Sequence, residues 1–180
     1  MQGFGHFPIR FLPSFRLQKT ATFMSQPTES PRSQQPGDAI LISCDPTRLD
    51  VLAIHQTLSN CYWSPGLPLA VLQKAIAGSL CFGAYHGSQQ VGFARVVTDR
   101  ATFAYLCDVY VLEAYRGQGI GRQLMEHVVA HPDLQGLRRF VLVTRDAHGL
   151  YARFGFTPLA KPQGFMEILR PDVYQQTPQP

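Results

Sequence analysis

The sequence predicts an α/β fold in which one mixed sheet is flanked by helices. Three observations support this class. Apolar runs rich in β-branched and aromatic residues, typical of strands, recur along the chain. The segments between them repeat apolar residues at the helical period of 3.6. Strand and helix patterns interleave, in the expected order of strand, two helices, three strands, helix, strand, helix and strand, instead of separating into two domains.

The first part of the expected domain contains one strand and two helices. Residues 39–45 form a short strand, and apolar residues at helical spacing predict a helix over 50–58. A second helix is expected over 69–78, where Gly78 ends it. The segment between the helices, 60–68, contains two prolines and one glycine, which predict a loop or a broken helix.

Three consecutive strands are expected next, over 79–86, 89–99 and 102–112. Tight turns at 87–88 and 99–100 separate these strands. All three are therefore expected to be neighbours in one sheet.

The last part of the domain alternates helices with strands. An apolar stripe predicts a helix over 120–131, and an unbroken apolar run predicts a buried strand over 138–144. A short helix follows over 147–154 and ends at Gly155. A final strand is expected over 164–170.

Length and composition indicate one folded domain. The chain has 180 residues, of which 45% are hydrophobic and 16% charged, as is typical of a soluble globular protein. The domain is expected to cover 38–172, with a disordered extension at 1–37 and a tail at 173–180. Residues 1–23 carry basic but no acidic side chains, as organelle transit peptides do, and Met24 is an alternative start. The expected location is cytoplasmic, with an organelle as the alternative.

Charge and cysteine usage argue against two classes of function. Four basic residues and one acidic residue lie in 1–37, so the rest of the chain holds only +1 of the net charge of +4. A nucleic-acid partner would require a broad basic surface. The four cysteines include no C-x-x-C pair, which predicts buried or semi-buried thiols in a reducing compartment and no metal site. No long apolar run predicts a membrane span.

Three glycines at alternate positions stand where a strand pattern changes to a helix pattern. Gly117, Gly119 and Gly121 lack a Cβ atom, so the backbone there can approach a ligand and adopt a positive φ. The first turn of a helix has free N–H groups and the positive end of the helix dipole. No Ser, Thr, Asn or Asp between Arg116 and Arg122 caps those groups. The pattern predicts a phosphate-binding loop, with a flexible connector as the alternative.

Other phosphate-binding motifs have a different spacing. A P-loop requires Lys followed by Ser or Thr, and this segment has neither pair. The dinucleotide fingerprint places its third glycine three residues after the second, where Arg122 stands.

The residues RGQGIG at 116–121 resemble the pyrophosphate-binding motif of the GNAT superfamily of acetyl-CoA-dependent N-acetyltransferases. The residues LYARFGF at 150–156 resemble the tyrosine-bearing helix and turn of the same superfamily. The resemblance spans about 39–170 and is strongest over 105–157. It implies a GNAT-like fold, with a central, mostly antiparallel sheet that contains two splayed strands and is flanked by helices.

The resemblance implies acetyl-CoA as cosubstrate and no metal. Backbone N–H groups from Gln118 to Arg122 would hold the diphosphate, and the backbone of Val109 and Val111 would bind the pantetheine arm. Thr144 stands where relatives often carry an Asn that contacts the cofactor. The residues assigned in this way to the cofactor are Val109, Val111, Arg116, Gly117, Gln118, Gly119, Ile120, Gly121, Arg122 and Thr144.

Two residues are candidates for catalysis. Tyr151 matches the tyrosine that protonates the departing thiolate in many relatives, and a tyrosine keeps its proton at neutral pH. Asp108 is a carboxylate within an apolar strand. It is interpreted either as the base, with a pKa raised by burial, or as a structural residue that accepts backbone hydrogen bonds at a bulge.

The resemblance also places Tyr62 and Trp63 on the wall of the acceptor pocket. The alternative is a hydrophobic plug over the core. The implied reaction is direct transfer of an acetyl group to a primary amine of a small molecule or protein. A non-catalytic acyl-CoA sensor and another nucleotide-binding protein are the alternatives. The expected partner is a small-molecule or peptide amine, with no nucleic acid or membrane, and the chain is a monomer or homodimer.

Overall fold

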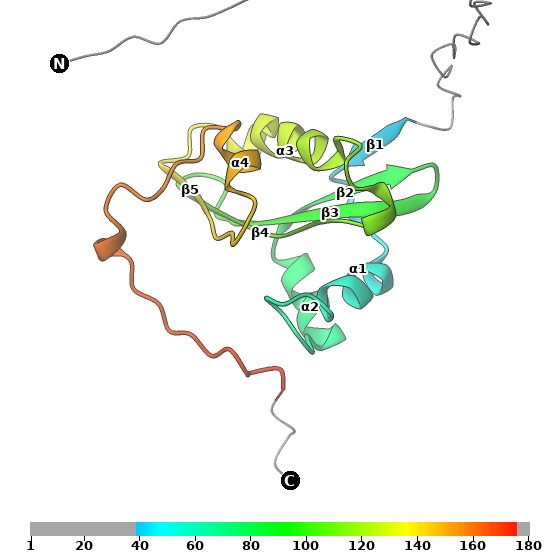
Figure 1. Cartoon of the computed structure of the whole chain (residues 1–180), viewed down its shortest axis with the longest axis horizontal. Coiled ribbons are helices and arrows are strands. Elements are labelled where there is room, and N and C mark those ends of the chain that lie inside the picture. Colours follow the sequence, from blue (N-terminus) through cyan, green and yellow to red (C-terminus); the bar gives the residue numbers. More distant parts are fainter. Residues whose placement is uncertain (1–38, 176–180) are drawn as a thin grey trace, which may run out of the picture. The chain divides into compact units, whose positions relative to one another are not determined.

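The computed structural model describes residues 39–175 (Figure 1). The extension predicted at 1–37, the alternative start at Met24 and residues 176–180 of the predicted tail lie outside the described residues.

A five-stranded sheet in the order β1-β2-β3-β4-β5 forms the centre of this part of the chain. The strands β1 to β4 pair antiparallel with their neighbours, whereas β4 and β5 pair parallel. The predicted mixed and mostly antiparallel sheet is therefore confirmed. The strands are β1 (Ile40–Ser43), β2 (Leu80–His86), β3 (Gln89–Thr98), β4 (Phe103–Val111) and β5 (Arg139–Leu142).

The parallel pairing of β4 and β5 is short. All of β5 pairs with the segment Phe103 to Leu106 of β4. Beyond that point β4 continues to Val111, while the chain that follows β5 no longer pairs with it. The two strands thus part after Leu106, as the predicted splay requires.

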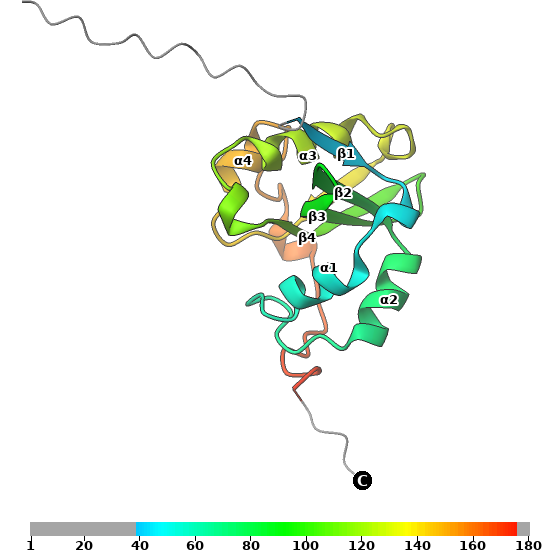
Figure 2. The ribbon, with the colours of Figure 1, turned by 90° about the vertical axis from the view of Figure 1, so that its right-hand side faces the viewer.

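Helices cover both faces of the sheet. Figures 1 and 2 show α1 and α2 on one face and α3 and α4 on the other. None of the helices within residues 39–175 has the length and apolar character needed to cross a membrane. The helices are α1 (Val51–Leu58), α2 (Leu69–Ala77), α3 (Ile120–Ala130) and α4 (His148–Ala152).

The apolar stripe of α3 fixes this helix on the sheet. Ile120, Leu124 and Val128 recur at every fourth position, and all three are buried against Phe82 and Val96 of the sheet. Burial of each such side chain contributes about 1.5–3 kcal/mol of transfer free energy. The first turn of α3 is therefore held in a defined place at the end of β4.

A second core lies on the opposite face. Ile54 and Leu58 of α1 and Leu72 of α2 pack there with Phe93 of β3. Asp50 caps α1, since its side chain accepts a hydrogen bond from the Ala53 N–H at 2.9 Å. This core supports the loop between α1 and α2, which was predicted as irregular and contains neither helix nor strand.

The strand predicted over 164–170 is wrong. A 3-10 turn covers Pro162–Gly164, and the chain after it joins no sheet in the described structure. Met166, Ile168 and Leu169 are exposed there. The residue pattern indicates a strand, but a strand also needs a partner, and this segment has none within the described chain.

Candidate active site

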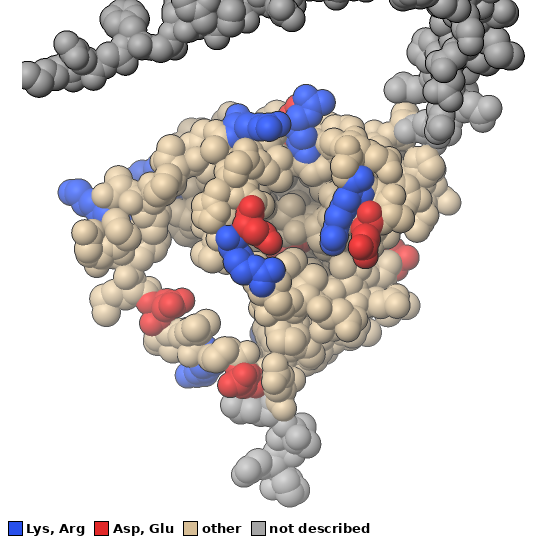
Figure 3. Space-filling model, in the orientation of Figure 1, with Lys and Arg blue, Asp and Glu red and all other residues tan. Residues whose placement is uncertain are grey.

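A cavity of about 1170 Å³ lies where β4 and β5 part. Its walls come from the second half of β4, the segment after β5, the loop between α1 and α2, and α4. Figure 3 shows a hollow on this face, with acidic and basic side chains around it. Asp108, Thr144 and Tyr151 line the cavity together with Tyr62 and Trp63. The structure thus brings together predicted site residues from four separate segments of the chain.

The glycine loop leads from the end of β4 into α3. Gly117 and Gly119 have φ angles of 77° and 78°, in the left-handed region that favours glycine. Gly119 occupies the N-cap position, where no side chain accepts a hydrogen bond from the first turn. Within the described residues, the N–H groups of Ile120, Gly121 and Arg122 have no acceptor. The predicted open helix N-terminus is present.

The side chains of the glycine loop do not point into the cavity. Gln118 donates to the Ala114 carbonyl at 3.3 Å, the Ile120 side chain is buried in the core, and Arg122 forms a loose, exposed ion pair with Glu126 at 3.5 Å. None of residues 117–122 belongs to the wall of the cavity, whereas the adjacent Arg116 does. The loop therefore lies at the margin of the cavity.

Arg116 connects the loop to β4. Its Nε donates to the carbonyl oxygen of Val111 at 3.2 Å. This hydrogen bond uses one backbone group that the resemblance assigns to the pantetheine arm. Val109 and Val111 both line the cavity, and Val109 lies at an irregularity of the β3–β4 ladder.

Asp108 lies on a β-bulge. Phe93 pairs with Tyr110 and Arg95 pairs with Cys107, so two residues of β4 stand opposite one residue of β3. Asp108 has a φ of 55°, a left-handed conformation that Asp tolerates better than most residues. The bulge expected at Asp108 is thus present, and the residue also lines the cavity. The expected backbone hydrogen bonds are not found: within residues 39–175 the carboxylate accepts a hydrogen bond from the Arg95 side chain instead.

Arg95 holds the carboxylate of Asp108. The Arg95 Nε donates to Asp108 Oδ2 at 2.6 Å, and its Nη1 donates to Ser79 Oγ at 3.1 Å. Ser79 Oγ in turn donates to the Ala75 carbonyl at 2.7 Å. Asp108 raises the pKa of Arg95, although burial of the guanidinium acts in the opposite direction and is the larger single effect. The second oxygen of Asp108 has no hydrogen-bond partner within the described residues.

The cysteines near this pair are neutral thiols. Burial, together with the nearby Asp108, raises the pKa of Cys107 to about 12. Burial likewise raises the pKa of Cys81 to about 11. Because the thiolate is the nucleophilic form of cysteine, neither residue is activated for a covalent step.

Tyr151 comes to the cavity from α4. It is 9% exposed, and its ring packs against Phe156 with 6.0 Å between ring centroids. Burial raises the pKa of its phenol above the ordinary value, with Asp146 acting in the same direction. The hydroxyl is therefore protonated at neutral pH and can donate a proton.

Thr144 has a structural contact as well as its place in the cavity wall. Its Oγ1 accepts a hydrogen bond from the Ala147 N–H at 3.0 Å, just before α4 begins. This contact orients the turn that leads to Tyr151.

Tyr62 and Trp63 stand in the loop between α1 and α2, with their rings edge to face at 4.8 Å. Both side chains are about half exposed, at 54% and 43%. The Arg145 guanidinium lies 3.8 Å from the centroid of the Tyr62 ring. This contact joins the loop between α1 and α2 to the segment after β5, and all three residues line the cavity.

Arg95 and Arg145 are site residues that sequence reasoning missed. For Arg95 a signal existed: an arginine within the apolar strand VGFARVV requires a buried partner. The next strand contains one acidic residue, Asp108. For Arg145 the sequence contains no comparable signal, because its contact with Tyr62 depends on two distant loops.

Comparisons with known proteins agree with this geometry. The acetyltransferase (GNAT) domain family matches residues 77–158. A protein of Gibberella zeae, provisionally named an acetyltransferase, is 36% identical over 146 residues, which cover 68% of this chain and 81% of that protein. A protein of Prochlorococcus marinus, named an uncharacterized N-acetyltransferase, is 31% identical over 99 residues, or 52% of this chain and 54% of that protein.

Solved structures share the fold. A crystal structure from Xanthomonas campestris pv. campestris, provisionally described as a GNAT-family acetyltransferase, is 54% identical, with a TM-score of 0.75 over 77% of this chain and 98% of that chain. A Mycobacterium tuberculosis protein solved in complex with CoA is 24% identical, with a TM-score of 0.54 over 66% of this chain and 72% of that chain. Sequence and fold together lead to one conclusion: the chain belongs to the GNAT family of acetyltransferases.

Proposed function

We propose that this protein is an N-acetyltransferase that moves an acetyl group from acetyl-CoA directly to a primary amine of a small molecule or peptide. The observation that carries the proposal is the arrangement of two features around one cavity. An uncapped helix N-terminus lies beside Arg116 at its margin, and the protonated phenol of Tyr151 forms part of its wall.

The N-terminus of α3 is suited to the diphosphate of CoA. The N–H groups of Ile120, Gly121 and Arg122 have no acceptor within residues 39–175. Together with the positive end of the helix dipole, they favour an anion there. The Arg116 and Arg122 guanidinium groups add positive charge. The CoA complex of the Mycobacterium tuberculosis protein, which shares the fold, supports the choice of this cosubstrate.

In the proposed reaction, the amine nitrogen forms a bond to the thioester carbon, and the bond from that carbon to sulfur breaks. Tyr151 donates its proton to the leaving sulfur. The free oxygen of the Asp108 carboxylate accepts the proton that the amine gives up, directly or through water. Arg95 holds the other oxygen of Asp108 and thereby orients this acceptor. Both residues line the same cavity, as the reaction requires.

The charges of the cavity wall indicate which class of amine can be the acceptor. The three acidic residues of the wall, Asp108, Glu113 and Asp146, are balanced by the three arginines Arg95, Arg116 and Arg145. A polyamine or aminoglycoside would need an excess of negative charge. The half-exposed rings of Tyr62 and Trp63 instead favour a monoamine with an apolar or aromatic body.

The test combines a binding measurement with a turnover measurement on the full chain. Thiol release from acetyl-CoA is followed against amino acids, arylamines, polyamines, aminoglycosides and peptides, and binding of acetyl-CoA is followed by thermal shift. The expected result is turnover with an arylamine or another apolar monoamine. The Tyr151→Phe variant is expected to bind acetyl-CoA normally and to form product about 10²–10⁴ times more slowly.

Three results would contradict the proposal. Acetyl-CoA binding without turnover of any amine would favour a non-catalytic sensor. Stabilisation by ATP or NAD but not by acetyl-CoA would favour another nucleotide ligand. Unchanged turnover in Tyr151→Phe would remove Tyr151 from the mechanism.

A further inference from the structure

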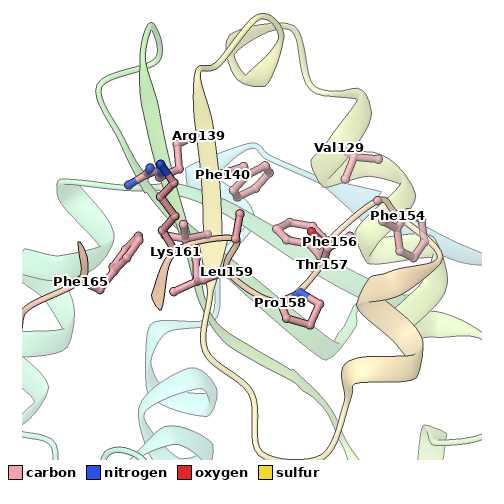
Figure 4. Close-up of a pocket in the computed structure, with 13 residues that line it drawn as sticks. Val129, Arg139, Phe140, Phe154, Phe156, Thr157, Pro158, Leu159, Lys161 and Phe165 are labelled. Atoms are coloured by element: carbon pink, nitrogen blue, oxygen red, sulfur yellow. The ribbon is translucent and has the colours of Figure 1, made fainter. Parts of the chain in front are cut away.

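The loop between α1 and α2, residues 59–68, forms one wall of the candidate active site. Residues 60–64 all line that cavity. A separate hollow beside β5, which Figure 4 shows among Phe140, Phe156 and Phe165, contains no residue of this loop. The side chains that the loop exposes at 62 and 63 therefore belong to the active-site cavity.

The rings of Tyr62 and Trp63 have little support of their own. They contact each other edge to face, and the Arg145 guanidinium lies over Tyr62, but both rings are about half exposed. Exposed side chains change rotamer within picoseconds to nanoseconds when nothing restrains them. The position of this aromatic wall therefore depends on how the backbone at 62–63 is held.

The residues on either side of the two rings are both bonded to the carbonyl oxygen of Leu58. The backbone N–H of Cys61 donates to this oxygen at 3.0 Å, and the hydroxyl of Ser64 donates to it at 2.8 Å. Leu58 is the last residue of α1 and is completely buried in the core. Tyr62 and Trp63 thus lie between two points that are attached to a fixed part of the fold.

Two further hydrogen bonds attach the end of the loop to α1 and its C-cap. The N–H of Gly66 donates to the carbonyl oxygen of Ser59 at 2.9 Å. His55 Nε2 lies 2.8 Å from the carbonyl oxygen of Leu67 and donates to it, because a carbonyl can only accept. The loop therefore has its conformation without any contribution from a ligand.

The Ser64 hydroxyl is the part of this attachment that a substitution can remove. The Ser64 N–H donates to the Cys61 carbonyl at 3.1 Å and closes the turn around the two rings, whereas the hydroxyl fastens this turn to α1. Ser64 is only 8% exposed. Without the hydroxyl, the Leu58 carbonyl still accepts from the Cys61 N–H, so no buried acceptor is left unpaired. Loss of the hydroxyl should loosen the turn without unfolding the protein.

We propose that Ser64 is a positioning residue, which holds Tyr62 and Trp63 as a preformed wall for the body of the acceptor amine. This inference rests on the proposed acetyltransferase function. Because the wall is ordered before the acceptor binds, less conformational entropy is lost on binding, and the KM for the acceptor is lower. Acetyl-CoA is assigned to the backbone of β4 and the N-terminus of α3, so its KM is independent of this wall.

The first test uses Trp63 itself, which is the single tryptophan of the chain. Time-resolved fluorescence anisotropy is measured on the full chain and on its Ser64→Ala variant. In the unchanged protein, the ring is expected to rotate only with the whole molecule. In Ser64→Ala, a fast component in the nanosecond range or below is expected in addition.

Gln135→Ala is the matched control for this measurement. The Gln135 Nε2 also donates to a carbonyl oxygen near the end of a helix, that of Val129 on α3, at 2.8 Å. Because α3 covers the opposite face of the sheet, this variant should keep the anisotropy decay of the unchanged protein.

Kinetics separate a positioning role from a general structural one. With an amine that the protein acetylates, Ser64→Ala is expected to raise the KM for the acceptor about three- to tenfold. The KM for acetyl-CoA and the kcat at saturating acceptor should not change. A general structural loss would instead raise both KM values or lower kcat.

Three results would overturn the assignment of Ser64. A fast component in the unchanged protein would show a mobile wall, and its absence from Ser64→Ala would show a wall that is held elsewhere. Equal rises in both KM values would show a loss that is not confined to the acceptor. Absence of turnover with every amine would contradict the proposed function instead, and the anisotropy would still decide whether Ser64 fixes Trp63.

Discussion

Arg95 on β3 and Asp108 on β4 form an ion pair of 2.6 Å at the bulge of the β3–β4 ladder, beside the candidate active site. The side chains are only 17% and 12% exposed. The positive φ of Asp108 belongs to the bulge, which changes the direction of its side chain from the one that a regular strand would give it. The position of the Asp108 carboxylate at the cavity therefore depends on both the bulge and the ion pair with Arg95.

Loss of Arg95 should destabilise the protein. The variant Arg95→Gln leaves the largely buried Asp108 carboxylate without its cation, so the free energy of unfolding should fall by about 1–3 kcal/mol. Urea unfolding measures this change. The control is Arg100→Gln, which removes an ion pair with Asp133 whose side chains are 58% and 37% exposed, and which should cost less than about 1 kcal/mol. Equal effects in the two variants would contradict the structural importance of the Arg95 pair.

Asp108→Asn separates the two interpretations of Asp108. Asparagine tolerates the left-handed conformation and still accepts a hydrogen bond from Arg95, so the fold should persist. If Asp108 accepts the proton of the amine, kcat should fall by about 10²–10⁴. The measurement is kcat, taken beside the free energy of unfolding of the same variant. A lower stability with normal kcat would leave Asp108 with a structural role alone.

Gly119→Ala tests the phosphate loop. An alanine at a φ of 78° should lower the free energy of unfolding by about 1–2 kcal/mol. It should also raise the KM for acetyl-CoA by about fivefold or more, the factor that corresponds to about 1 kcal/mol. The matched control is Gly136→Ala, at a φ of 69° and with equally open surroundings. That control should show the same loss of stability at an unchanged KM, and a rise of its KM would contradict the assignment.

The raised pKa of Cys107 predicts that the stability of the protein falls at alkaline pH. Folding raises the pKa of this thiol from an ordinary value of 9.0 to about 12, through burial first and Asp108 second. Below pH 9 the thiol is protonated in both states, and its contribution to stability is fully present. As the pH rises from about 9 toward 12, the unfolded state loses its proton first, so stability falls.

The measurement is the urea midpoint at several pH values between 7 and about 11. Cys107→Ala should flatten the decline, whereas Cys44→Ala, at an exposed position, should leave it unchanged. In the native protein at pH 7, a thiol reagent should modify Cys44 and leave Cys107 unmodified. Rapid modification of Cys107 at that pH would contradict its raised pKa.

Local sequence determined most of the elements and the phosphate loop. The apolar stripe of α3, the turns between β2, β3 and β4, and the glycines at positions 117 and 119 depend on residues close together in the chain. The backbone preferences of single residues and the periodicity of apolar residues are properties of short stretches of sequence. These features were therefore predictable from the residues alone. The resemblance to GNAT proteins added the splay of the sheet and the role expected of Tyr151.

Tertiary structure alone decided the rest. Arg95 meets Asp108 only through the register and the bulge of two strands, and Arg145 reaches Tyr62 only because two distant loops lie side by side. The segment 164–170 has the residues of a strand, but pairing requires a free edge in the right place and orientation. Such contacts depend on where separate elements come to rest in space, which no short stretch of sequence encodes.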